Sequence, residues 1–233
     1  YTDFVIAKAA ENKQKRAEEN SGYIEASQAG MCYKKHWYRQ QNQEPKPFVT
    51  SSLKIMRLGT VMGDEFDKGP RHWIKDNKDV KLYSELLMKS ETLNVAGHMD
   101  LLIVEPNGKG YLWDWKTANS YKYKMIFNSN GFGSPSTNYE LQVATYGLLA
   151  IENQLCETIE HLGLIYYNKD NSSMKEKIVD MNYMDKARKY WQDIPFSEPD
   201  YGMGKVPVYK WECGKYCNYS HVCGSPFLTK EVK

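Results

Sequence analysis

The chain has 233 residues, of which 41% are hydrophobic and 26% are charged, and its formal net charge is +2. This length suits one sizeable core with appended pieces, and the composition excludes a disordered chain. No apolar run approaches the about 20 residues needed to cross a bilayer, which excludes a membrane-spanning protein.

The first part of the chain alternates helix-forming stretches with loops. Residues 1–20 are mostly Ala, Lys, Glu and Gln, which predicts an exposed leading helix. Because this opening stretch is charged and does not resemble the apolar segment of a signal peptide, we expect a cytoplasmic protein. A second helix is predicted over 27–39 and a third over 51–68, ended by Gly69 and Pro70.

The middle of the chain has the composition of β-strands. Strand-like residues begin near Val80 and resume over 92–105. The segment Pro106–Gly110 is rich in turn residues, so 111–117 is predicted to return antiparallel to the preceding strand.

Further helices and strands follow. The segment 119–136 is rich in Asn, Ser, Gly and aromatic residues and predicts a long loop. Thr137 and Glu140 form a capping box, which predicts a helix from about 138 to 153. The remaining predicted elements are a strand over 161–168, its hairpin partner over 172–181, a helix over 184–194 and an irregular tail. The fold expected from this order is α/β, with a central mixed sheet.

Three charged side chains are predicted to meet on the central hairpin. If Pro106–Gly110 form a five-residue loop, Asp100 lies opposite Lys116, with about 5 Å between their Cβ atoms. Asp114 shares a face with Lys116, because strand side chains repeat every two residues. Two carboxylates and one ammonium group therefore converge.

Two neighbouring carboxylates repel each other unless a cation lies between them. Hard oxygen ligands favour Mg²⁺ or Mn²⁺, and a lysine beside them can act on a phosphate or on an attacking water. The arrangement predicts phosphodiester hydrolysis. The alternative is an ordinary surface salt bridge, and the apolar character of both strand faces argues against it. The apolar residues are Leu101, Ile103, Trp113 and Trp115 on one face, predicted to be buried, and Leu102, Val104 and Leu112 on the other.

The motif Gly97-His-Met-Asp100, thirteen further residues and then Asp114-Trp-Lys116-Thr117 resemble the second and third motifs of the RecB-like PD-(D/E)XK nucleases. The resemblance implies a restriction-endonuclease-like core, a central mixed sheet flanked by helices. It also implies that Asp100, Asp114 and the Trp115 carbonyl oxygen bind the metal. Lys116 is then expected to polarise the nucleophile or the scissile phosphate.

Gln142 and Tyr146 lie four residues apart and share a face of the predicted helix. They resemble the family's Q-x-x-x-Y motif, which lies beside the active site. Without the family, such a pair is more typical of the edge of a core.

The family's first motif places a His or an acid four residues after a glycine. Here Gly59 is followed at that distance by Gly63, and Gly63 by Asp67. We expect Asp67 or Glu65 to be an additional metal ligand, and a solvated acidic helix end is the alternative.

Cys213, Cys217 and Cys223 lie within eleven residues, and Cys32 lies on the predicted second helix. Four thiolates suit Zn²⁺ or an iron-sulphur cluster. One cysteine before the core and three after it resemble the 4Fe-4S staple of RecB-like nucleases, including AddB and the CRISPR-associated RecB-like exonucleases. Those usually show C-x2-C-x5-C, whereas the first gap here has three residues. A zinc site completed by Cys32 or His221 is the alternative.

Aromatic residues and lysines alternate just after the Asp114–Lys116 strand. This composition suits stacking on unpaired bases and contacts with phosphates. The predicted DNA contacts are Tyr121, Lys122, Tyr123 and Lys124, and a flexible surface loop is the alternative.

By the resemblance, 1–26 is a leading helix, 27–224 is a nuclease domain with a cysteine-ligated cap from both chain ends, and 225–233 is a tail. The implied activity is exonucleolytic hydrolysis of single-stranded DNA or of DNA ends with Mg²⁺ or Mn²⁺, in a bacterial or phage context. Two alternatives remain: a non-catalytic nuclease-like DNA-binding subunit, and a zinc-stabilised RNA-processing nuclease.

Overall fold

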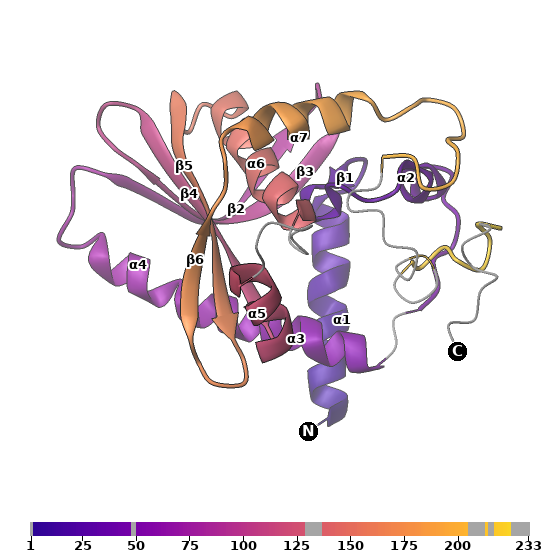
Figure 1. Ribbon diagram of the computed structural model, residues 1–233, viewed down its shortest axis with the longest axis horizontal. Coiled ribbons are helices and arrows are strands. Elements are labelled where there is room, and N and C mark those ends of the chain that lie inside the picture. Colours follow the sequence, from indigo (N-terminus) through magenta and orange to yellow (C-terminus); the bar gives the residue numbers. More distant parts are fainter. Residues whose placement is uncertain (1, 48–49, 129–136, 205–212, 214–216, 225–233) are drawn as a thin grey trace.

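The computed structural model describes residues 2–47, 50–128, 137–204, 213 and 217–224. A six-stranded mixed sheet flanked by helices forms its centre (Figure 1), which confirms the predicted α/β fold. The strands are β1 (Ile24–Glu25), β2 (Lys81–Ser90), β3 (Val95–Val104), β4 (Lys109–Ala118), β5 (Thr158–Asn168) and β6 (Met174–Ile178). The helices are α1 (Thr2–Glu19), α2 (Tyr33–Gln40), α3 (Thr50–Phe66), α4 (Lys68–Trp73), α5 (Ser120–Asn128), α6 (Thr137–Glu152) and α7 (Asn182–Gln192), with a 3-10 turn at Ala26–Gln28. Within this described part, no helix has the length and apolar character needed to span a membrane.

Strand β3 has neighbours along both of its edges. On one edge, β2 runs antiparallel to it over its whole length. The other edge is shared, because β1 pairs in parallel with Val95 and Ala96 whereas β4 pairs antiparallel with 101–104. Beyond β4 the sheet continues with β5, parallel to β4, and β6, antiparallel to β5. The segment of β3 between its two partners, Gly97 to Asp100, carries the predicted metal-binding aspartate.

The hairpin between β3 and β4 has a shorter loop than the sequence predicts. Glu105 N–H donates to the Lys109 carbonyl at 2.9 Å, and Gly108 N–H donates to the Glu105 carbonyl at 3.0 Å. Gly108 has a φ of +82°, a conformation that glycine adopts without a Cβ clash. The turn therefore closes around 106–108, and the predicted five-residue loop is wrong.

The shorter loop moves the register of the hairpin by two residues. Leu101 pairs with Trp113, so Asp100 lies level with Asp114 rather than with Lys116. A shift of two residues leaves each side chain on its predicted face. The three charged residues therefore still converge.

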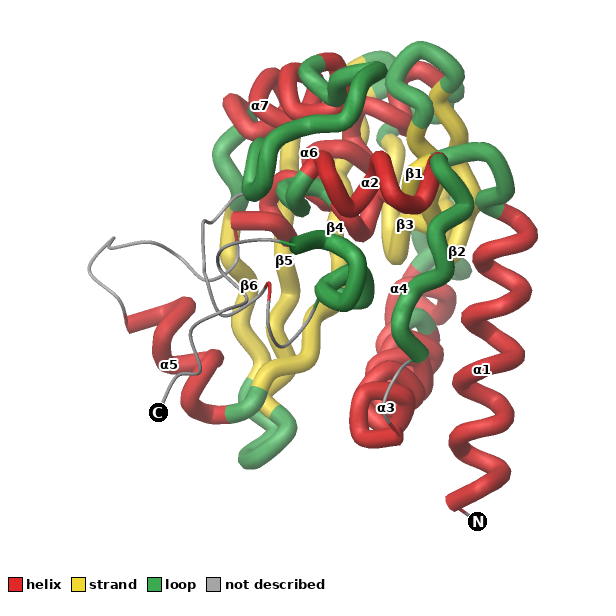
Figure 2. Tube along the Cα trace, turned by 90° about the vertical axis from the view of Figure 1, so that its right-hand side faces the viewer, coloured by secondary structure: helices red, strands yellow, loops and turns green. Residues whose placement is uncertain are grey.

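Helix α6 is buried from Glu140 to Ala150, which is typical of a helix inside a core. It packs on β5 and against α7, and Figure 2 shows both helices on the same side of the sheet. Fully buried side chains of α6, β3, β4 and β5 include Val143, Leu149, Leu102, Leu112, Leu162 and Leu164. This packing holds one face of α6 against the Asp114 side of β4.

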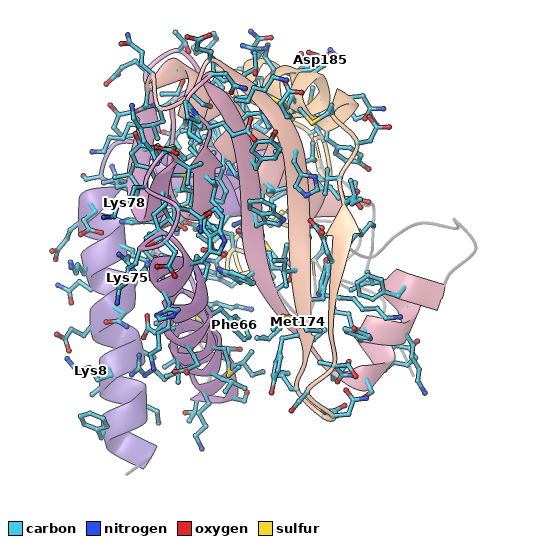
Figure 3. The ribbon with its side chains drawn as sticks, turned by 90° about the vertical axis from the view of Figure 1, so that its left-hand side faces the viewer. Lys8, Phe66, Lys75, Lys78, Met174 and Asp185 are labelled. Atoms are coloured by element: carbon cyan, nitrogen blue, oxygen red, sulfur yellow. The ribbon has the colours of Figure 1, made fainter. Side chains whose placement is uncertain are left out.

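The opposite face of the sheet is only partly covered. Trp113 and Trp115 were expected to be buried and are partly exposed. Phe66, at the end of α3, lies next to the sheet (Figure 3) and packs on Trp115 with 5.2 Å between ring centroids. Helix α1 packs beside α3, which extends this side of the molecule beyond the sheet (Figures 1 and 2).

The predicted loop over 119–136 is wrong in its first half, which forms α5. The Asn119 side chain accepts the Lys122 N–H at 2.8 Å and so caps this helix. Tyr123 and Ile126, three residues apart, are buried against the core. This tertiary burial stabilises a helix that the composition alone does not predict.

Two predicted helix boundaries also differ. Gly69 and Pro70 do not end the third helical region, because Pro70 lies in the first turn of α4, where a missing N–H costs nothing. The second helix begins at Tyr33 rather than at residue 27, and Gly30, with a φ of +73°, separates it from the 3-10 turn. Cys32 is thus the residue just before α2.

Candidate active site

Asp100 and Asp114 meet where β4 separates from β3. Beyond the Leu101–Trp113 pair, the Trp115 N–H donates to Asp100 Oδ2 at 2.6 Å in place of a backbone acceptor. Asp114 is buried, with 1% of its surface exposed. The divergence of the strands therefore makes room for two carboxyl groups inside the sheet edge.

The carboxyl groups of Asp100 and Asp114 perturb each other. Burial raises the pKa of Asp100 well above its usual range, and the negative charge of Asp114 raises it further. Burial also raises the pKa of Asp114, although the Lys116 ammonium opposes this shift. The fold thus disfavours the ionised forms of Asp100 and Asp114.

Lys116 forms an ion pair with Asp114. Burial lowers its pKa, but the carboxylates of Asp114 and Asp100 raise it more, so the net pKa is raised and the lysine stays charged. Two carboxylates around one ammonium leave one excess negative charge. A divalent cation would neutralise that excess.

Helix α6 contacts Asp114 through a hydrogen bond from Gln142. Gln142 Nε2 donates to Asp114 Oδ1 at 3.4 Å and to the Tyr146 hydroxyl at 3.1 Å. Burial, followed by the charges of Asp114 and Asp100, raises the pKa of Tyr146 well above its usual range, so its hydroxyl remains a neutral hydrogen-bond donor. The predicted pair therefore lies against the carboxylates.

Tyr146 also explains the glycine of the Gly97-His-Met-Asp motif. A Cβ atom at Gly97 would lie 2.9 Å from Tyr146 Cε1 and 2.9 Å from Ala26 Cβ. Such contacts are shorter than van der Waals distance, so only glycine lets α6 approach β3 here.

The two candidate ligands of the first motif lie in different surroundings. Glu65 is exposed and pairs with Lys68. The Asp67 side chain is largely buried and pairs with Arg71. Its negative charge also raises the pKa of Glu85, which places Asp67 near the site. The fold therefore brings Asp67, and not Glu65, toward the carboxylates.

Glu85 is an acid that the sequence pattern did not single out. It lies on β2 level with Asp100, since Ser84 and Leu86 on either side pair with the neighbours of Asp100. Its φ is +50°, an unfavourable conformation for a non-glycine residue and typical of functional sites. In the sequence, the signal that could have identified Glu85 is its position as a charged residue within an apolar strand.

The surroundings of Glu85 tie it to the same site. Burial raises its pKa, while Arg16 lowers it, and Asp64, Asp67 and Asp114 raise it again. Arg16 Nη2 lies 3.0 Å from Glu85 Oε2. Helix α1 thus supplies a cation to the acid next to Asp100.

The ligand set fits a hard divalent cation that keeps part of its coordination for water and substrate. Among the described residues, no three His, Cys, Asp or Glu side chains approach closely enough to enclose an ion. Mg²⁺ is commonly bound by one or two carboxylates, with water and phosphate oxygens completing its shell. Asp100 and Asp114, whose pKa values are raised mainly by burial, provide two such carboxylates.

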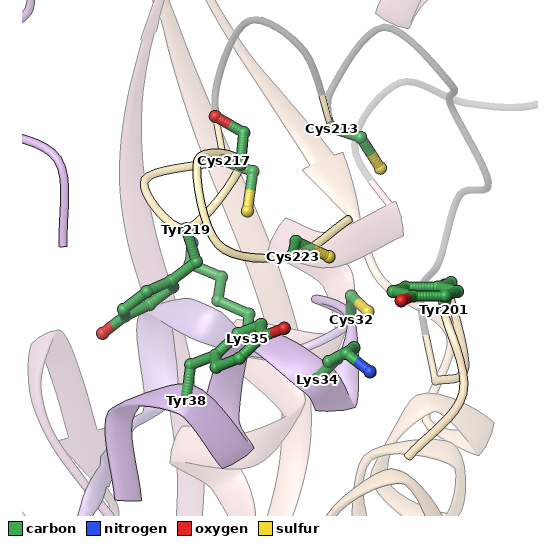
Figure 4. A pocket seen from close by; sticks show the side chains of 11 residues that line it. Cys32, Lys34, Lys35, Tyr38, Tyr201, Cys213, Cys217, Tyr219 and Cys223 are labelled. Atoms are coloured by element: carbon green, nitrogen blue, oxygen red, sulfur yellow. The ribbon is translucent and has the colours of Figure 1, made fainter. Parts of the chain in front are cut away.

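The four predicted cysteine ligands line one pocket (Figure 4). Cys32 precedes α2, and Cys217 and Cys223 flank a turn that packs on this helix through Tyr219 and Tyr38, with ring centroids 5.6 Å apart. Cys213, Lys34, Lys35 and Tyr201 also line this pocket, whereas His221 does not. All four cysteines are free thiols.

The predicted DNA contacts on 121–124 do not form one surface. Tyr121 and Lys124 are exposed, whereas Tyr123 is buried and packs on Phe127 with 4.8 Å between ring centroids. The Tyr123 ring is therefore not accessible to a base. Lys122 turns toward Tyr139 of α6, and its ammonium donates to the Tyr139 hydroxyl at 3.2 Å.

Solved structures share this architecture. The structure described as SSO0001 superposes with a TM-score of 0.53 at 19% identity, over 96% of this chain and 95% of that chain. An alkaline exonuclease, LHK-Exo from Laribacter hongkongensis, gives a TM-score of 0.43 at 14% identity, over 78% of this chain and 90% of that chain. The first likeness supports the fold alone, and the second is too distant to carry an argument.

Comparison by sequence is more decisive. No curated protein sequence matches the chain significantly. The family model of the PD-(D/E)XK nuclease superfamily matches residues 4–224, which include both strands of the β3–β4 hairpin and the Gln142–Tyr146 helix. The chain therefore belongs to the PD-(D/E)XK nuclease superfamily.

Proposed function

We propose that this protein is a divalent-metal-dependent exonuclease that hydrolyses phosphodiester bonds of single-stranded DNA or of DNA ends. The observation that carries the proposal is the group formed by the buried Asp114 and the partly buried Asp100 and Lys116, at the point where β3 and β4 separate. Gln142 and Tyr146 behind it support the same reading. Membership of a nuclease superfamily is consistent with a nucleic-acid substrate.

Each residue has a role that follows from its contacts. Asp100, Asp114 and the Trp115 carbonyl would hold Mg²⁺ or Mn²⁺, which supplies Lewis-acid stabilisation of the phosphoryl oxygens. Lys116, charged and held by Asp114, is placed to donate to a phosphate oxygen or to orient the attacking water. Gln142 positions Asp114 through its hydrogen bond. Asp67 is the supported choice for an additional ligand.

The cysteine pocket is proposed to hold a 4Fe-4S cluster, with zinc as the alternative. Four thiols line the pocket, one from before the sheet and three from after it, which is the order that the resemblance to the 4Fe-4S nucleases predicts. Four thiolates suit either group. Lys34 and Lys35 on the pocket wall would offset the charge of the thiolates.

Cleavage of end-labelled DNA tests the nuclease activity. Single-stranded and double-stranded substrates are incubated with Mg²⁺, Mn²⁺ or EDTA, with the wild type, Lys116→Ala and the exposed control Lys78→Ala. We expect EDTA to abolish cleavage by every protein. With Mg²⁺ or Mn²⁺, we expect Lys116→Ala to lose activity and Lys78→Ala to retain it. Equal cleavage by wild type and Lys116→Ala would contradict the assigned site. Metal-dependent binding without cleavage would favour a non-catalytic subunit, and preferential cleavage of a competing RNA would favour an RNA-processing enzyme.

Metal analysis tests the cysteine pocket independently of activity. Protein purified without oxygen is expected to contain iron and acid-labile sulphide in equal amounts, and Cys217→Ser is expected to lose both. Stoichiometric zinc without sulphide would instead establish the zinc alternative.

A further inference from the structure

Two lysines from different elements converge on one tyrosine ring beside the candidate active site. Lys116 comes from β4, Lys122 from α5 and Tyr139 from α6. The two ammonium nitrogens lie 4.9 Å and 4.5 Å from the centre of the Tyr139 ring. Lys122 Nζ also donates to the Tyr139 hydroxyl at 3.2 Å. A second cation is therefore held close to the lysine of the proposed catalytic group.

The two lysines differ in how their charges are balanced. Lys116 pairs with Asp114. Within the described residues, the contacts of the Lys122 ammonium are the hydroxyl and the ring of Tyr139, and no carboxylate lies within ion-pair distance. A cation–π contact compensates a charge far less than a carboxylate does. Gathering two ammonium groups is unfavourable unless an anion binds between or beside them.

The positive charges of Lys116 and Lys122 change the pKa of Tyr139. Burial raises the pKa of its phenol, but Lys122 and Lys116 lower it more, so the net pKa falls below its usual value. The hydroxyl accepts a hydrogen bond from Lys122, and its own proton is available to an acceptor. An ammonium and a polarised phenol side by side form a pair of donors for a phosphate oxygen.

We propose that Lys122 and Tyr139 bind the phosphate next to the scissile phosphate of a nucleic-acid strand. The inference rests on the proposed nuclease function and adds a second phosphate subsite to it. Lys116 serves the scissile group, while Lys122, held on the same ring, serves a neighbouring group on the same strand. The subsite sets how the strand is held rather than the chemistry at Asp114.

Binding to modified oligonucleotides tests the subsite without relying on cleavage. The probe is a fluorescent single-stranded DNA, measured by anisotropy in Ca²⁺ and in EDTA. Lys122→Gln is expected to weaken binding about 10-fold and to reduce the slope of log K against log salt by about 1. Tyr139→Phe keeps the ring and loses the hydroxyl, so a smaller loss is expected. Lys78→Gln removes the charge of an exposed lysine outside the proposed sites, so it is the matched control and should change binding less than about 2-fold.

Single neutral linkages locate the contact. In a set of oligonucleotides, each carrying one methylphosphonate, one position is expected to weaken binding by the wild type but not by Lys122→Gln. Where cleavage is measured, Lys122→Gln should raise KM while leaving kcat within about 3-fold.

The possible failures are distinguishable. A wild type that cleaves DNA, combined with a Lys122→Gln variant of unchanged affinity, salt slope and KM, overturns the subsite alone. A wild type that neither binds nor cleaves any nucleic acid overturns the proposed function and the subsite together. Equal thermal unfolding of Lys122→Gln and wild type shows that a loss of binding is not a loss of fold.

Discussion

Replacing Asp100 by asparagine should abolish activity and stabilise the metal-free protein. Burial and then the charge of Asp114 raise the pKa of Asp100. An acid with a raised folded-state pKa binds more protons when folded, so the unfolding free energy falls as pH rises above the unfolded pKa of about 4. Above neutral pH, the metal-free fold therefore carries a penalty that Asp100→Asn removes.

The charges set the size of this effect. Two like charges about 4 Å apart repel by about 4 kcal/mol at an effective dielectric constant of about 20. Lys116, paired with Asp114, offsets most of that repulsion. We expect Asp100→Asn to gain about 1 to 2 kcal/mol of unfolding free energy at about pH 8 in EDTA. The asparagine keeps an oxygen that accepts the Trp115 N–H.

Urea unfolding of wild type and Asp100→Asn, with and without Mg²⁺, measures both consequences. Wild type should be stabilised by Mg²⁺, because the ion binds only the folded state, and the variant should respond much less. Asp76→Asn, an exposed position, controls for the change in net charge. If Asp100→Asn unfolds at lower urea than wild type in EDTA, the repulsion between the carboxylates is not a cost of the fold and the argument is refuted.

Three further outcomes are expected. Burial lowers the pKa of His36 to about 3, so its contribution to stability is complete above about pH 6.5. It should fall by about 1.4 kcal/mol per pH unit below that value, and urea unfolding of wild type and His36→Gln should diverge in this window. Gly163→Ala places a Cβ 2.5 Å from Trp113 Cδ1 and should cost about 1 to 3 kcal/mol in the same assay. Glu85→Gln, which breaks the ion pair with Arg16, should raise the Mg²⁺ concentration for half-maximal cleavage about 10-fold.

Matched variants make these outcomes decisive. Parallel pH profiles for wild type and His36→Gln would exclude a buried neutral histidine. Gly147→Ala, whose Cβ would lie 3.4 Å from its nearest neighbour, should be tolerated where Gly163→Ala is not. An unchanged metal requirement for Glu85→Gln, or an equal change for the exposed Glu160→Gln, would remove Glu85 from the metal site.

The sequence predicts the hairpin and its charged residues well, because strand alternation and turn residues are local properties. The faces of Asp114 and Lys116 follow from a period of two, and the spacing of Gln142 and Tyr146 follows from the helical repeat. The register is harder to predict. The turn has a loop of three residues instead of the predicted five, and it depends on the positive φ of Gly108. A shift by two happens to preserve every face.

Other parts of the site depend on contacts that no local pattern contains. The burial of Tyr123 that stabilises α5 is supplied by the sheet. Glu85 reaches Asp100 through strand pairing across the β2–β3 hairpin. Tyr139 of α6 contacts Lys122 of α5 because both helices pack against β4 and β5. The sequence can single out some of these residues, but only the tertiary structure shows which of them contact one another.

The cysteine pocket has a consequence for the order of folding. It joins a residue just before α2 to residues near 213–223, with the whole sheet lying between them along the chain. During synthesis the first thiol emerges long before the others, and the strands of the sheet are complete before its partners exist. Closing so long a loop is entropically slow unless the intervening chain is already compact. We therefore expect the cysteine pocket to form late, after the nuclease core has folded.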